Sequence, residues 1–190
     1  MRVTRPITQA ELIQTWLLAE LGSSRFSSEL KSAVKKHGHK LSLVTKPNLK
    51  NYDENKARAR VLREYRGQFW DALQNREWNL VELDQADVRE LIYTDWQHWK
   101  KLSGYTRLVG RAADNIKDGL VDDRAPMDSF FELAKQIEQG TELNPIVLID
   151  HVLDGKQIAL EVIEGHLRST AYAMADKPST PLMAYIGSTQ

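Results

Sequence analysis

Residues 157–175 read QIALEVIEGHLRSTAYAMA, and this stretch decides how the C-terminal part of the chain folds. It begins as an apolar run, breaks at Glu164-Gly165-His166, and continues in an alanine-rich pattern typical of a helix. A strand that stops at a glycine and turns directly into a helix leaves free backbone N–H groups at the helix start, where the helix dipole is positive. The break therefore predicts a phosphate site.

Three side chains at this break have chemistry that suits such a site. Arg168 could grip a phosphate with two N–H groups at once, Glu164 could orient a metal ion or a hydroxyl, and His166 could donate, accept or shuttle a proton. The alternative is structural: Glu164 and Arg168 lie one helical turn apart and pair with each other, while His166 caps or packs. An internal carboxylate would then occupy the helix start in place of a ligand.

The composition excludes several classes of protein. The 190-residue chain is long enough for one domain, or for a small core plus an extension. It has no cysteine, and Lys plus Arg equals Asp plus Glu at 26 each, so no net charge attracts it to nucleic acid or to an anionic membrane. Gln14 and Thr15 interrupt the apolar N-terminal stretch, which argues against a signal peptide or membrane span. We expect a soluble cytoplasmic protein.

Residues 1–77 predict a helical extension. Thr8 and Glu11 have the spacing of a capping box at the start of an amphipathic pattern. The expected elements are helices over residues 8–22, 27–38 and 53–74, with a short strand over residues 41–45. The arginines of residues 56–66 are interspersed with acids, which favours a solvated, salt-bridged face over a surface that contacts phosphates.

Residues 78–190 predict a second domain that contains a sheet. The expected elements are a strand over residues 78–83, a helical insertion at about 84–125, a helix after Asp128, hairpin strands over 146–153 and 156–163, a helix after Gly165, and a last strand over 182–186. Asp154-Gly155 predicts a type I′ turn between antiparallel strands. The fold class is therefore α+β, a small mixed sheet with packed helices, preceded by the helical extension.

Two tryptophans in the insertion allow two interpretations. Trp96 and Trp99 lie three residues apart and could clamp a nucleic-acid base between them. Tryptophans at helical spacing more often pack in a core or against another helix, and packing is what we expect here.

The order of elements resembles the ParB/sulfiredoxin-like fold. The segment ELAKQIEQGTELNPIVLI, which leads into the hairpin, is similar to the segment before the second strand of ParB proteins. At the turn, ParB proteins carry Gly-Glu-Arg-Arg, which only Gly165 and Arg168 match. Sulfiredoxins carry Gly-Cys-His-Arg, and here His166 replaces the cysteine, which excludes sulfinic acid reduction.

The turn is most similar to the acid-Gly-His-x-Arg pattern of the free-serine kinase branch, matched by EGHLR at residues 164–168. As a whole, the chain resembles a ParB-like group with the same N-terminal extension and an LEGHVR-type turn. The resemblance covers residues 126–190 and extends to the strand at 78–83, with 84–125 as an insertion. It implies a nucleotide whose phosphates lie on the turn, cradled by Arg168 and backbone amides.

The resemblance also implies a cofactor and an activity. The cofactor would be ATP, ADP or CTP with Mg²⁺, and the activity that of a nucleotide-dependent phosphotransferase or a nucleotide-hydrolysing switch. Glu164 would hold part of the Mg²⁺, and Glu164 or His166 would orient the hydroxyl of a small-molecule or protein acceptor. The cradle would comprise Gly165, His166, Arg168, Ser169 and Thr170, with more distant positive charge from Arg107.

Two other classes of function remain open at this stage. A nucleic-acid-directed ParB-like nuclease or DNA adaptor would use the arginines of residues 56–66, although the net charge argues against it. ParB partition proteins also continue into a helix-turn-helix region after this fold, whereas this sequence ends at Gln190. A non-enzymatic module of a toxin-antitoxin or phage-defence system would dock a partner on residues 1–77. Assembly into a homodimer is compatible with each of these functions.

Overall fold

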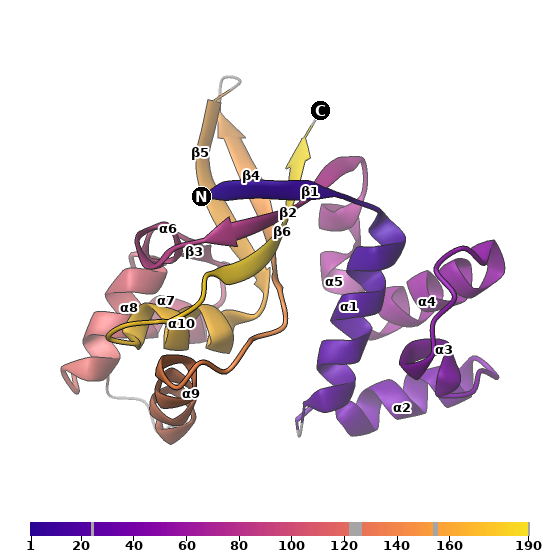
Figure 1. Cartoon of the computed structure of the whole chain (residues 1–190), viewed down its shortest axis with the longest axis horizontal. Helices are drawn as coiled ribbons and strands as arrows, with labels where there is room; N and C mark the ends of the chain where they lie inside the picture. The colour runs from indigo at the N-terminus through magenta and orange to yellow at the C-terminus, as the bar shows by residue number, and fades with distance from the viewer. Residues whose placement is uncertain (24, 122–126, 154–155, 190) are drawn as a thin grey trace. The chain divides into compact units, whose positions relative to one another are not determined.

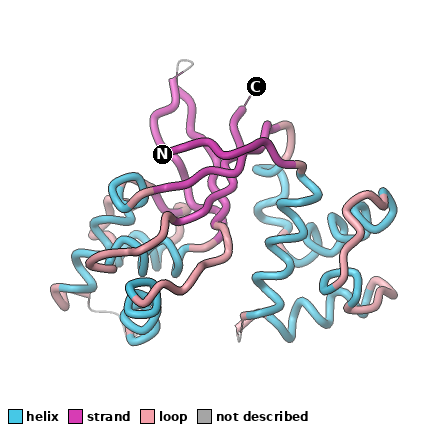
Figure 2. The backbone as a smooth tube through the Cα atoms, viewed as in Figure 1, coloured by secondary structure: helices cyan, strands magenta, loops and turns pink. Residues whose placement is uncertain are grey.

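The computed structural model describes residues 1–23, 25–121, 127–153 and 156–189. Within these ranges the chain has the expected α+β fold, with helices and a six-stranded mixed sheet, drawn in magenta in Figure 2. The chain divides into two compact units, one made of residues 6–78 and the other of residues 1–5 together with 79–190. The Asp154-Gly155 turn lies outside the described residues.

The sheet has the strand order β1-β2-β6-β4-β5-β3. Its strands are β1 (Arg2–Ile7), β2 (Arg76–Leu83), β3 (Ile92–Tyr93), β4 (Ile146–Leu153), β5 (Lys156–Glu164) and β6 (Leu182–Thr189). β4 pairs antiparallel with β5, as the sequence predicts, and parallel with β6. β3 pairs parallel with β5 at the far edge, which makes the sheet mixed.

The register of β4 and β5 shifts by one residue near the end of β5. Leu148 pairs with Val162, whereas Val147 pairs with Glu164, so Ile163 has no partner of its own in this ladder. Such a β-bulge bends the strand and changes the direction of the residues that follow it. Glu164 is therefore displaced by one position from the register that pairs Leu148 with Val162.

The core of the larger unit forms where strands meet three helices, α8 (Val109–Lys117), α9 (Asp128–Glu138) and α10 (His166–Met174). Ile146, Leu148 and Val162 contribute from the central strands. α10 contacts α8, α9 and the shorter α6 (Gln85–Arg89), and Figure 1 shows these helices grouped together. Because α10 packs against all three, its residues 169–174 are buried.

The unit of residues 6–78 is a small bundle of helices. The helices are α1 (Gln9–Gly22), α2 (Ser27–Lys36), α3 (Ser42–Thr45), α4 (Tyr52–Tyr65) and α5 (Gly67–Trp70), followed by a 3₁₀ turn at Asp71–Leu73. α1 contacts α2 and α4, and Trp16 and Leu62 lie buried in its core. Thr8 caps α1, because its hydroxyl accepts a hydrogen bond from the N–H of Glu11, as the capping spacing predicts.

Two predictions for this unit are wrong in detail. Residues 41–45 were expected to form a strand but contain the helical turn α3, which packs against α1 and α4. A short apolar run has no periodicity that distinguishes the two, so tertiary contacts decide. The long helix over residues 53–74 ends at Tyr65, because Arg66 leaves the helical region at φ −129° and ψ 38°, and a separate helix starts at Gly67.

The arginines of residues 56–66 make internal contacts. Arg58 is fully buried and donates hydrogen bonds to backbone carbonyls, at 3.0 Å to that of Leu43. Arg66 pairs with the buried carboxylate of Glu20 at 2.7 Å. Arg58 and Arg66 are therefore interior groups and differ from the solvated, salt-bridged face expected from the sequence. Neither guanidinium is presented as part of a surface for nucleic acid.

Candidate functional site

The proposed site begins at Gly165, where β5 ends and α10 starts. Gly165 has φ 97° and ψ 24°, a left-handed conformation that side chains rarely adopt. A Cβ at this position would lie 2.4 Å from Cγ2 of Ile146, the first residue of β4. Both the backbone angle and the contact therefore require glycine, and the strand–glycine–helix turn predicted from the sequence is present.

The N-terminal end of α10 has no side-chain cap. The N–H of Ser169 donates to the carbonyl of Gly165 at 2.9 Å, and the N–H groups of residues 166–168 precede this first helical hydrogen bond. Gly165 has no side chain with which to accept from them. The helix dipole places partial positive charge at this end, where an oxyanion is favourable.

The C-terminal end of α10 is, by contrast, well supplied with donors. Gln85 donates to the carbonyls of Tyr172 and Ala175, and Lys117 donates to that of Met174 at 3.2 Å. Arg89 adds a hydrogen bond to the carbonyl of Ala173 at 3.4 Å. Cations at this end also complement the negative pole of the helix dipole. Three side chains from other elements therefore donate hydrogen bonds to the C-terminal carbonyls of α10, whereas its N-terminal amides have no side-chain cap.

Arg168 lies directly over the glycine turn. Its Nη2 atom is 3.1 Å from the position that a Cβ of Gly165 would occupy, and it pairs with the carboxylate of Glu164. Its Nη1 atom donates to the carbonyl of Asn144 at 3.1 Å. The Glu164–Arg168 pair matches the structural alternative raised by the sequence. The same contacts also hold the guanidinium beside the N-terminal end of α10.

Glu164 by itself is a poor resident ligand for a metal ion. A Mg²⁺ ion prefers several oxygen ligands and would lie beside the positive charge of Arg168. Among the described residues, no group of three or more His, Asp or Glu side chains is placed to hold a metal. The arrangement therefore fits an anion bound to Arg168. It fits less well a metal ion bound to Glu164 when no anion is present.

His166 is held as a neutral imidazole. The hydroxyl of Thr94 donates its single proton to the carbonyl of Val162 at 2.8 Å, so it accepts from Nε2 of His166 at 3.0 Å. This hydrogen bond selects the Nε2–H tautomer and leaves Nδ1 as the lone-pair acceptor. Burial, with smaller effects from His98 and Arg168, lowers the pKa of His166 to about 3. His166 is therefore a hydrogen-bonding group and a weak base, which makes the predicted catalytic role less favourable than the predicted binding role.

Aromatic rings surround His166 on the side of β3 and α7 (Gln97–Leu102). The centroid of the Trp99 ring lies 4.8 Å from that of His166 and 4.9 Å from that of Tyr93. The ring centroids of His166 and Tyr93 are 5.9 Å apart. The rings of Tyr93, Trp99 and His166 therefore form one cluster, in which each ring packs against the other two. Trp96 is also parallel to His166, with ring centroids 6.0 Å apart.

Ser169 and Thr170 face the inside of the protein. Both are fully buried, and both hydroxyls donate to the carbonyl of His166, at 3.0 Å and 2.6 Å. The Tyr93 hydroxyl lies 2.6 Å from Oγ1 of Thr170 and donates to it, because the threonine proton is already used. Ser169 and Thr170 therefore stabilise the first turn of α10. Their hydroxyls are buried and are not available to a ligand, in contrast to the expected binding role.

Arg107 belongs to a different cluster. Its Nε donates to the carbonyl of Tyr93 at 2.8 Å and its Nη2 to Glu161 at 2.9 Å. Glu161 also meets Nε2 of His151 at 2.5 Å. The hydrogen bonds described for the Arg107 guanidinium thus lead to β3 and β5, and the structure does not bring Arg107 to the first turn of α10.

The sequence offered no signal for Thr94 or Tyr93 as partners of the site. They lie in or next to a two-residue strand, and only the parallel pairing of β3 with β5 brings them to His166. The positions of Trp96 and Trp99 beside His166 depend on the same pairing. Their spacing alone carries no information on which ring they would meet.

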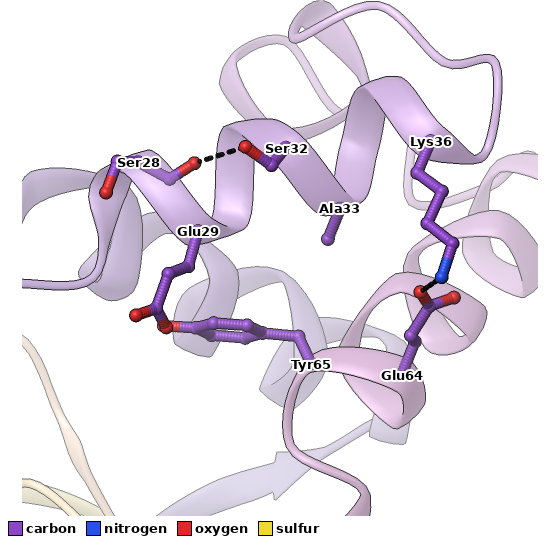
Figure 3. Close-up of a pocket in the computed structure, with 7 residues that line it drawn as sticks. All are labelled: Ser28, Glu29, Ser32, Ala33, Lys36, Glu64 and Tyr65. Atoms are coloured by element: carbon purple, nitrogen blue, oxygen red, sulfur yellow. Dashed lines mark hydrogen bonds and ion pairs between the residues drawn. The ribbon is translucent and has the colours of Figure 1, made fainter.

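An open pocket of about 460 Å³ lies elsewhere, in the unit of residues 6–78, and Figure 3 shows it between α2 and α4. It is lined by Ser28, Glu29, Ser32, Ala33, Lys36, Glu64 and Tyr65. Lys36 and Glu64 form an ion pair at its edge. None of the residues expected to bind phosphate lines this pocket.

Comparisons of the chain with protein-family models, with curated proteins and with solved structures find no match. In the described ranges, no helix is both long and apolar enough to span a membrane.

Replacing Gly165 by alanine tests whether the close approach to Ile146 shapes the turn. We expect Gly165→Ala to lower the free energy of unfolding by about 2–5 kcal/mol, from left-handed strain of about 1–2 kcal/mol and overpacking of about 1–3 kcal/mol. Gly140 is a matched control, because it has φ 89° but a Cβ there would only reach 3.6 Å from Ser179. Urea denaturation should show the larger loss at Gly165, and equal losses would contradict the account.

The protonation of His166 can be followed by NMR. An ordinary histidine titrates near pH 6.5, whereas the ring signals of His166 should stay those of neutral imidazole down to about pH 5. Because the unfolded chain gains a proton below pH 6.5 that the folded chain does not, this group should make stability fall as pH falls from 6.5 toward 3, by at most about 1.4 kcal/mol per pH unit. His166→Gln identifies the signals, and a midpoint near 6.5 would refute the prediction.

Proposed function

We propose that this protein binds the phosphates of a nucleotide at the N-terminal end of α10. The observation that carries the proposal is the contrast between the two ends of this helix, three donors at its C-terminal carbonyls and no side-chain cap at its N-terminal amides. Arg168 adds a guanidinium at the end without a cap. Backbone amides, a helix dipole and an arginine are the groups that bind phosphate in other proteins.

Glu164 acts in this proposal as the partner of Arg168 in the absence of ligand. Its carboxylate satisfies a guanidinium whose side chain is only 15% exposed and would otherwise be a poorly solvated cation. A phosphate carries more charge and more acceptor oxygens than a carboxylate, so it can replace Glu164 on Arg168 and also reach the amides. Glu164 is then released to meet a Mg²⁺ ion that the phosphates bring with them.

The nucleotide class rests on the resemblance to the ParB/sulfiredoxin-like fold. The EGHLR turn of residues 164–168 supports ATP, ADP or CTP with Mg²⁺ as the ligand. Phosphotransfer or nucleotide hydrolysis is the chemistry that such a site would serve, since positioning and charge stabilisation are most of what that chemistry requires. The neutral His166 supports a role in orienting a hydroxyl or a water by hydrogen bonding, more than a role as a strong base.

Calorimetric titration with ADP, ATP and CTP in the presence of Mg²⁺ tests the proposal. At least one nucleotide should bind, and Arg168→Ala should weaken it about 10- to 100-fold, because a hydrogen-bonded charge contact contributes about 1.5–3 kcal/mol. Arg168→Lys should recover only part of the loss, since lysine lacks the planar fork.

Arg111→Ala is the matched control for this titration. It removes the same charge from an exposed position of α8 in the same unit and should leave the affinity unchanged. Absence of heat with every nucleotide would overturn the proposal, and so would equal affinity of Arg168→Ala and the unaltered protein.

A further inference from the structure

Trp96 is the exposed member of the aromatic cluster around His166. Tyr93 is fully buried and Trp99 packs against the core, whereas Trp96 is 44% exposed. A single exposed aromatic ring is ordinary in a folded protein. Trp96 is distinguished by its position, because its ring lies parallel to that of His166, the first residue of α10. The expectation of packing therefore holds for Trp99, and Trp96 differs from it.

The exposed indole lies parallel to the ring of His166, the residue that starts α10. Its plane lies within 9° of that of His166, with ring centroids 6.0 Å apart, and His166 is the first residue of the helix. The hydrogen bond with Thr94 fixes the orientation of the His166 ring, beside which Trp96 lies. The ring and the N-terminal amides therefore have a defined spatial relationship.

The backbone on both sides of Trp96 is also held. Its N–H donates to the carbonyl of Thr94 at 2.7 Å, and its own carbonyl accepts from the N–H of Lys100 at 3.0 Å in the first turn of α7. Lys100 also pairs with Asp95 across this turn. A ring that is already positioned loses little freedom when a second ring stacks on it.

We infer that Trp96 is a stacking platform for the base of the nucleotide, and this inference rests on the proposed function of α10. The phosphates bind at the N-terminal end of α10 beside Arg168, and the base stacks on the indole of Trp96. The nucleotide therefore extends from the charged group to the aromatic ring. Stacking on an indole tolerates every base, because each base has an aromatic face. A two-ring purine offers more area than a one-ring pyrimidine, so the site should prefer ADP to CDP by a few-fold.

Ligands with and without a base separate this platform from the phosphate anchor. In calorimetry, ADP should bind the unaltered protein about 5- to 100-fold more tightly than inorganic pyrophosphate, the range expected for one stacked base. Trp96→Ala should remove this difference and leave pyrophosphate binding as it was. Trp96→Phe should keep part of it, and Trp96→Leu, which retains apolar bulk without a flat face, should not.

The outcomes distinguish the two proposals. If pyrophosphate and ADP bind equally well to the unaltered protein, or if the difference survives in Trp96→Ala and Trp96→Leu, the platform is refuted and the phosphate site stands. If neither ligand binds, the proposed function fails and the platform fails with it. If one of the variants does not fold, as judged by circular dichroism, the comparison of Trp96→Phe with the remaining variant decides in the same way.

Discussion

The close contact between Gly165 and Ile146 is the constraint on which the rest of the site depends. With no Cβ between them, the end of β5 can turn in a left-handed conformation and start α10 against the first residue of β4. The turn brings the guanidinium of Arg168 close to the glycine that precedes the first helical residue. A single steric condition therefore places a cation beside the end of the helix where the dipole is positive.

Charge compensation explains how such a site can exist in a protein with no net charge. Glu164, the last residue of β5, neutralises Arg168 in the first turn of α10, and the β-bulge at Ile163 lies directly before it. His166 remains neutral because burial opposes a second positive charge beside Arg168. In the proposed function, binding of an anion would exchange one negative partner of Arg168 for another, and the measured affinity would be the difference between two similar interactions. The affinity should consequently depend on how well the ligand uses the backbone amides as well as the guanidinium.

Local patterns in the sequence predicted much of the fold. The break at Gly165 and the hairpin pairing of β4 with β5 depend on neighbours along the chain, and each is present. The helical turn at residues 42–45 and the break after Tyr65 depend on packing, and each was missed. For the site, the sequence predicted the pair of Glu164 and Arg168 as an alternative, because oppositely charged residues four apart at a helix start can meet. The inward hydroxyls of Ser169 and Thr170, the partners of Arg107 and the Thr94–His166 hydrogen bond arise from parallel pairing of β3 with β5 and from helix burial, which no short-range pattern encodes.

The most direct test of the account observes the amides themselves. In a ¹H–¹⁵N correlation spectrum titrated with inorganic pyrophosphate, the account predicts that the largest shifts occur at the backbone N–H groups of residues 166–168 and at the side chain of Arg168, because these groups would donate to the added oxyanion. Shifts confined to residues 6–78, or a spectrum in which residues 166–168 do not move while other signals do, would contradict the claim that the N-terminal end of α10 is an anion site.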